Sequence, residues 1–71
     1  MNIYFFKRDN YSYDEVTEQL IVANSPKEAE ENITCGEEGF EEWENIKPKF
    51  ISKYTGRKKT PFILMVNYNN A

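Results

Sequence analysis

The stretch VTEQLIVANSPKE, residues 16–28, contains a strand signal followed directly by a helix start. Its first eight residues alternate between two sides, which is typical of a β-strand with two different faces. One side carries Val16, Leu20 and Val22, and the other carries Thr17, Gln19 and Ile21. The residues that follow match a helix start: Ser25 is a favoured cap, Pro26 fits the first helical position, and Glu28 completes a capping box.

On the N-terminal side of this stretch, residues 1–6 (MNIYFF) are aromatic and β-prone, which predicts a first strand. The polar residues 7–14 then suit a hairpin loop. We therefore expect the first strand to pair antiparallel with residues 16–23.

The helix that starts at Pro26 is expected to continue to Cys35, with Gly36 as a left-handed terminator. Ala29 and Ile33 lie four residues apart, so one narrow apolar stripe can face the sheet.

Residues 37–47 (EEGFEEWENIK) predict a second, short helix of one or two turns. Phe40, Trp43 and Ile46 recur every three residues and would form its apolar edge. Pro48 disfavours helix at the residue before it, so this element ends there.

Two more strands are predicted in the remaining chain. Residues 49–54 alternate in polarity, and residues 60–68 (TPFILMVNY) form the most apolar run of the sequence. Residues 55–59 lie between them, contain Gly56, and predict a basic hairpin loop. Residues 69–71 form a polar end.

The fold class expected from this order is α+β with two layers. One antiparallel four-stranded sheet carries one main helix, in the order strand, strand, helix, short helix, strand, strand. The chain has 71 residues and a mass of 8.4 kDa, so residues 1–71 are expected to form a single small domain. Hairpins determine the neighbours within each strand pair, while the order in which the two pairs join is left open.

Charge is strongly segregated along the chain, although the net charge is only −3. All twelve acids lie between residues 9 and 44 with a single lysine, which gives this stretch a charge of −11. Residues 47–59 hold six basic residues and no acid, a charge of +6. Such segregation bears on partners and on electrostatic steering, while solvated surface charge is the other interpretation.

The residue inventory argues against an enzyme. The chain has no histidine and one cysteine, and it contains no catalytic, cofactor or calcium-loop motif. We expect no cofactor and no metal, and we expect Cys35 to be an inert packed thiol. No apolar run approaches the 18 residues of a membrane span, so we expect no membrane contact and a cytoplasmic location.

The acidic stretch predicts a protein-binding surface that imitates DNA. Carboxylates three or four residues apart on a helix lie about 5–6 Å from one another, which is a spacing suited to a basic DNA-binding surface. Phe40 and Trp43 would anchor such an interface if partly exposed, and core packing is their alternative role. The candidate partner-binding residues are Asp9, Asp14, Glu15, Glu28, Glu31, Glu37, Glu38, Glu41, Glu42 and Glu44.

With its acidic runs EAEEN and EEGFEEWEN on a strand–helix–strand frame, the chain resembles small acidic bacteriophage host-takeover proteins of the DNA-mimic type. This group includes inhibitors of the nucleoid protein HU. The resemblance implies an inhibitor whose partner is a basic DNA-binding protein of the host, acting in the host cell cytoplasm without direct nucleic-acid contact.

Two other functions remain open. The first is a small interaction module that pairs through a sheet edge or an apolar patch. The second is nucleic-acid binding, in which residues 47–59 contact phosphates while Phe50, Tyr54 or Tyr4 stack on bases. Residues 60–68 carry no charge, so at a sheet edge they would favour a homodimer, which we expect.

Overall fold

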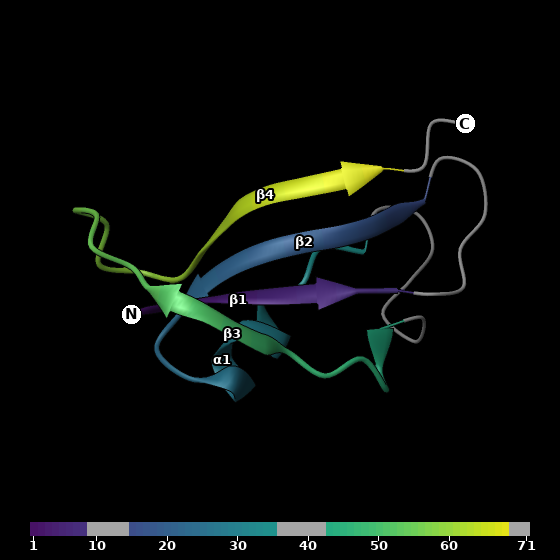
Figure 1. The fold of residues 1–71 in the computed structure, drawn as a ribbon, viewed down its shortest axis with the longest axis horizontal. Helices are drawn as coiled ribbons and strands as arrows, with labels where there is room; N and C mark the ends of the chain where they lie inside the picture. Colours follow the sequence, from purple (N-terminus) through teal and green to yellow (C-terminus); the bar gives the residue numbers. More distant parts are fainter. Residues whose placement is uncertain (9–14, 36–42, 69–71) are drawn as a thin grey trace.

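A computed structural model describes residues 1–8, 15–35 and 43–68, which form a four-stranded antiparallel sheet and one short helix (Figure 1). The small α+β fold expected from the sequence is therefore confirmed. The elements in chain order are β1 (Asn2–Lys7), β2 (Val16–Ala23), α1 (Pro26–Glu31), β3 (Lys49–Lys53) and β4 (Phe62–Tyr68).

The strands lie side by side in the order β3-β1-β2-β4. The expected antiparallel pair of β1 and β2 forms at the centre of the sheet, with Tyr4 opposite Ile21. β3 adds to the free side of β1, and β4 adds to the free side of β2.

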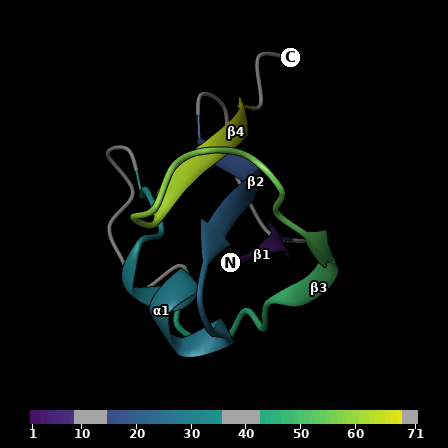
Figure 2. The same cartoon turned by 90° about the vertical axis from the view of Figure 1, so that its left-hand side faces the viewer.

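The predicted hairpin between the last two strands is wrong, because β3 and β4 lie at opposite edges of the sheet. The chain between them crosses one end of the sheet, where it appears as an arc in Figure 2. Three strand spacings of about 4.8 Å separate the edges, and the eight residues 54–61 can span more than that distance. The connection is anchored where β1 begins, because the Tyr54 amide donates to the Met1 carbonyl at 2.9 Å.

The predicted start of α1 is confirmed by its hydrogen bonds. The Glu28 amide donates to Ser25 Oγ at 3.2 Å, and Pro26 occupies the first turn. The Glu28 carboxylate reaches back one residue beyond the cap and accepts from the Asn24 amide at 2.8 Å. The first bond satisfies a donor that a helix start otherwise leaves unpaired, and the second ties the residue before the cap to the first turn.

The helix ends at Glu31, so its expected continuation to Cys35 is wrong. Asn32 caps it, and its Nδ2 donates to the Glu28 carbonyl at 2.7 Å. The Thr34 amide cannot bond a helical carbonyl, because it donates to the side chain of Gln19 in β2. Gly36, the expected terminator, lies outside the described residues.

The predicted second helix falls largely outside the described residues. Its described part, residues 43–47, contains one turn in which the Ile46 amide donates to the Trp43 carbonyl at 3.0 Å.

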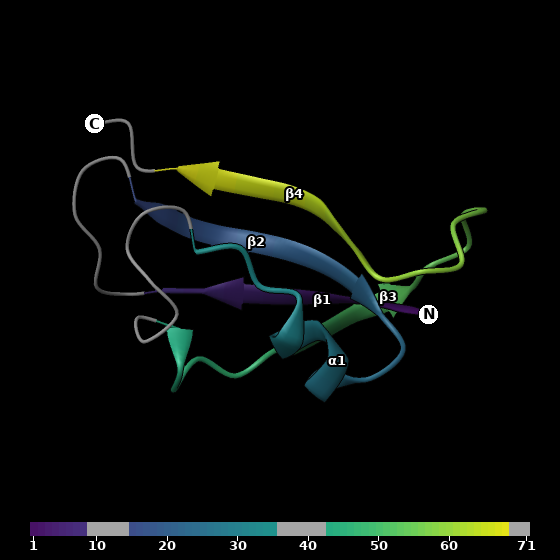
Figure 3. The ribbon, with the colours of Figure 1, turned by 180° about the vertical axis from the view of Figure 1, so that it is seen from behind.

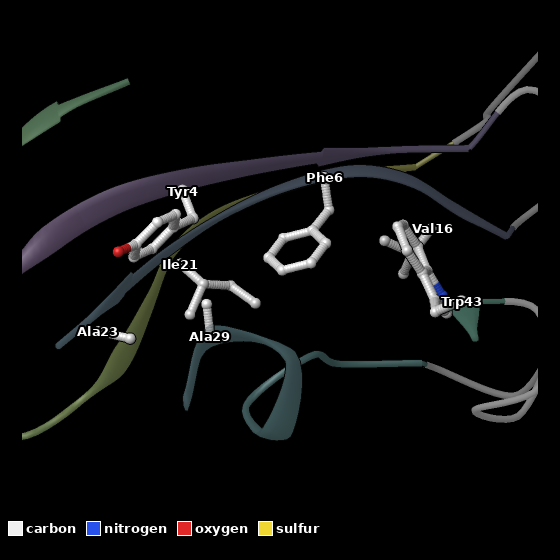
Figure 4. Packing of buried hydrophobic residues seen from close by; sticks show 7 residues of the cluster. All are labelled: Tyr4, Phe6, Val16, Ile21, Ala23, Ala29 and Trp43. Carbon is white, nitrogen blue, oxygen red and sulfur yellow. The ribbon is translucent and has the colours of Figure 1, made fainter. Parts of the chain in front are cut away.

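The core lies between the sheet and the layer that contains α1 (Figures 3 and 4). Alternate residues of β1 and β2 point toward Ala29 and Trp43, as expected for strands with one covered face. The cluster comprises Tyr4, Phe6, Val16, Ile21, Ala23, Ala29 and Trp43. Val16 was expected to share a face with Leu20 and Val22, yet it packs with Ile21. The register with β4 shifts between Val16 and Glu18, which breaks the alternation there.

Candidate interaction surfaces

β4 forms an apolar edge of the sheet. Within the part of the chain that the structure describes, the strand pairs only with β2, and none of its seven residues is charged. Its exposed large hydrophobic residues are Ile63, Leu64, Met65 and Tyr68, with exposed fractions between 40% and 58%. An edge of this kind presents apolar side chains and unpaired backbone groups together, which makes it a template for another strand.

The opposite edge, β3, differs from β4 in charge. β3 begins with Lys49 and ends with Lys53, and between them it exposes Phe50 and Ile51. Both edge strands show a register shift against their neighbour, so a bulge does not distinguish them. Lysines are a common protection of an edge strand against pairing, and only β3 has them.

The face of the sheet opposite the core contains an apolar hollow of about 410 Å³. Phe5, Leu20, Ile51 and Met65 contribute its apolar lining, one from each strand. Glu18 and Lys49 are among its polar lining residues. Met65 therefore belongs both to the hollow and to the β4 edge, so the two features form one continuous surface.

The connection from β3 to β4 covers one end of this face. The Tyr54 and Phe62 rings meet edge to face with centroids 5.3 Å apart. Lys58 Nζ lies 4.4 Å from the centre of the Phe62 ring, and Val22, paired with Phe62, is fully buried. These contacts organise the basic connection as a structured element beside β4.

A second, polar hollow of about 230 Å³ lies at this end of the sheet and is lined by Met1, Asn24, Tyr54, Gly56, Lys58 and Lys59. Its lysines are exposed to solvent. Of the aromatic residues suggested for base stacking, Tyr4 is buried in the core and Tyr54 is half-buried against Phe62. Only Phe50 is exposed, and it makes an edge contact with Tyr4. A stacking platform of these aromatic residues is therefore not present.

The candidate acidic residues have different positions in the fold. Glu15 Oε2 accepts from Arg8 Nη2 at 2.9 Å, and Glu28 caps α1, so both serve the structure itself. Glu31 and Glu44 are exposed. The candidates outside the described residues are Asp9, Asp14, Glu37, Glu38, Glu41 and Glu42.

Trp43 is only 1% exposed, so its alternative role in core packing is the one observed. Its indole nitrogen has no hydrogen-bond partner among the described residues. Phe40, the other suggested anchor, lies outside them.

Sequence reasoning missed two buried polar residues. No core position was predicted for Arg8, yet it is 2% exposed and its guanidinium carbon lies 5.4 Å from the centre of the Trp43 ring. The same alternation that places Tyr4 and Phe6 in the core continues to Arg8, and this was the available signal. Gln19 was placed on a strand face, but its role in binding the chain after α1 was not anticipated.

Little in the described residues suggests reaction chemistry. Cys35 is half-buried and packs against the core cluster. No group of three or more metal-ligating side chains occurs within residues 1–8, 15–35 and 43–68. In the same part of the chain, no helix has the length and apolar character needed to cross a membrane.

Comparisons of this chain with protein-family models, with curated proteins and with solved structures found no match.

Proposed function

We propose that this protein is an interaction module that binds a polypeptide chain by adding a strand to β4. The observation that carries this proposal is the contrast between the two sheet edges: β4 is apolar and uncharged, whereas β3 carries Lys49 and Lys53. Main-chain hydrogen bonds along the edge would supply affinity, and the pockets beside the strand would supply specificity.

Burial of apolar surface supports the same conclusion. Covering a large apolar side chain completely contributes about 1.5–3 kcal/mol, and those of β4 are roughly half exposed in the free protein. Ile63, Leu64 and Met65 are adjacent in sequence and therefore serve both faces of one added strand. The hollow beside Met65 would accept a side chain of that strand.

The test is a tagged pull-down in which Met65→Lys is compared with Ser52→Lys. Both residues are exposed edge positions, so each variant should fold, and Ser52→Lys is the matched control on β3. A salt-resistant partner should be retained by the wild type and by the control, and lost by Met65→Lys, because an apolar interface survives high ionic strength. Retention by Met65→Lys would contradict the proposal.

A second candidate is an inhibitor that imitates DNA and blocks the basic surface of a DNA-binding protein. The observation favouring it is that Glu30, Glu31 and Glu44 form no ion pair within the described part of the chain. Carboxylates without a cation beside them would attract a basic partner rapidly and with strong salt dependence.

Charge reversal tests this second candidate independently of β4. One double variant combines Glu31→Lys with Glu44→Lys. A second combines Glu41→Lys with Glu42→Lys, as the sequence suggests. Each should abolish capture of a basic partner that elutes with salt. Exposed charges contribute little to stability, so folding should be retained for Glu31 and Glu44. Unchanged affinity in both double variants would exclude DNA mimicry.

A further inference from the structure

We propose that the chain added to β4 is a second copy of this protein, an inference that rests on the proposed function of this edge. The two β4 strands would run antiparallel about a two-fold axis, and the two four-stranded sheets would merge into one continuous sheet. The resulting interface is isologous, with the same surface contributed by each copy.

The two ends of β4 differ in the charge of their surroundings. The basic residues Arg57, Lys58 and Lys59 precede its first residue. At its other end, Asn67 pairs with Glu18, and its Nδ2 donates to Glu18 Oε1 at 3.0 Å. Glu18 also pairs with Lys7 of β1, so the charges of these two residues balance. Figure 1 shows these two ends at opposite sides of the sheet, with the basic connection beyond the start of β4.

This charge distribution selects an antiparallel pair of identical strands. In that arrangement the basic connections of the two copies lie at opposite ends of the interface, each beside the end of β4 that is not basic. A parallel pair would instead place the two basic connections together, where like charges repel. Since β4 itself has no charge, nothing along the strand opposes contact with its own copy.

Met65 would lie at the centre of the symmetric pair. It is the middle residue of β4 and its most exposed large hydrophobic residue, at 58%. A symmetric register places Met65 beside Met65 of the partner subunit. The apolar hollows of the two copies would then adjoin each other across the axis.

The size of a standard interface can be compared with the surface and length of this molecule. A standard interface buries about 800 Å² per partner, which is roughly a sixth of the 4974 Å² surface of the described chain. β4 runs along the longest dimension of the molecule, 34 Å, so two copies would meet along their longest side (Figure 1).

The first test is sedimentation equilibrium over micromolar concentrations. The wild type should have the mass of two 8.4 kDa chains, and so should the matched control Ser52→Lys. Met65→Lys should be a monomer with an unchanged circular dichroism spectrum, because a charge at an exposed edge opposes pairing without entering the core.

Crosslinking then tests the register. In a Cys35→Ala background, Met65→Cys should form an intermolecular disulfide on mild oxidation, since residues facing each other across an antiparallel pair lie within disulfide range. Ile51→Cys, an exposed residue on the other edge, is the control and should remain reduced. Equal crosslinking of the two variants would contradict the β4 interface.

The outcomes separate this inference from the proposed function. A monomeric wild type over the whole concentration range overturns the second copy as occupant. If Met65→Lys nevertheless loses a salt-resistant partner of different sequence, the function of the β4 edge stands. A dimer that Met65→Lys leaves intact overturns the inference of β4 pairing, and the pull-down then decides the proposed function.

Discussion

Gln19 in β2 and Thr34, fifteen residues later, are joined by two hydrogen bonds. Gln19 Nε2 donates to the Thr34 carbonyl at 3.1 Å, and the Thr34 amide donates to Gln19 Oε1 at 2.9 Å. The Gln19 side chain is 2% exposed, so this pair satisfies polar groups that are shielded from water. The sheet therefore holds the chain that leaves α1, and a continued helix is incompatible with these bonds.

Replacing Gln19 with leucine should lower the free energy of unfolding by about 1–3 kcal/mol, because both Thr34 backbone groups would lose their partners. Urea unfolding followed by circular dichroism measures the change. Ser52→Ala on exposed β3 is the control and should alter stability by less than about 0.5 kcal/mol. Equal stability of wild type and Gln19→Leu would mean that these bonds contribute nothing net.

Arg8 and Glu15 should show unequal costs when each is removed. Arg8 is buried, contacts Trp43, and donates from Nη1 to the Val16 carbonyl at 3.2 Å, so Arg8→Ala should cost about 3 kcal/mol. Glu15 has a side chain 26% exposed, and its removal leaves Arg8 with its bond to the Val16 carbonyl and its contact with Trp43, so Glu15→Ala should cost less. A double-mutant cycle by urea unfolding measures their coupling. A larger loss from Glu15→Ala than from Arg8→Ala would contradict this assignment.

The capping residues of α1 should respond to loss of the hydrogen bond and not to loss of charge. Ser25→Ala should destabilise the fold by about 1 kcal/mol, since the Glu28 amide loses its acceptor. Glu28→Gln retains an acceptor for Asn24 and should be close to neutral, whereas Glu28→Ala should be destabilising. Thermal unfolding of the three variants provides the measurement. Similar losses for glutamine and alanine would show that the carboxylate charge matters more than the bond.

Gly56 should not tolerate a side chain while Tyr54 holds its position. A Cβ at Gly56 would come far inside van der Waals contact with the Tyr54 hydroxyl, so the ring must move away from Phe62. Gly56→Ala should therefore cost about 1 kcal/mol, similar to the value of an aromatic pair. In a Tyr54→Ala background the same substitution should cost nothing further. Aromatic proton shifts of Phe62 report the contact, and unchanged shifts in Gly56→Ala would contradict the prediction.

Local patterns in the sequence predicted the elements whose signals are local. Strand propensity, alternation and apolar runs predicted all four strands to within two residues, and Ser25, Pro26 and Glu28 predicted the start of α1. The end of α1 was not predictable in this way, because it depends on Gln19, which is distant in sequence. The burial of Arg8 depends in the same manner on Trp43, thirty-five residues away.

The same distinction between local sequence patterns and long-range contacts applies to the candidate surfaces. The uncharged run that contains β4 was evident in the sequence, and its importance at a sheet edge was expected. Its actual position at an edge was left open, because the local patterns do not determine the order in which the strands join. Of the acidic candidates, Glu15 and Glu28 were assigned to a partner surface, but their hydrogen bonds serve the fold.

By itself, the sequence determined where strands form, where the helix begins, and how charge is distributed along the chain. These properties depend on neighbouring residues, through side-chain alternation, capping and composition. Only the tertiary structure decided that β4 occupies one edge of the sheet and that β3 occupies the opposite edge. Strand pairing is settled by contacts between residues far apart in the chain, and the eight-residue connection is long enough to permit more than one pairing.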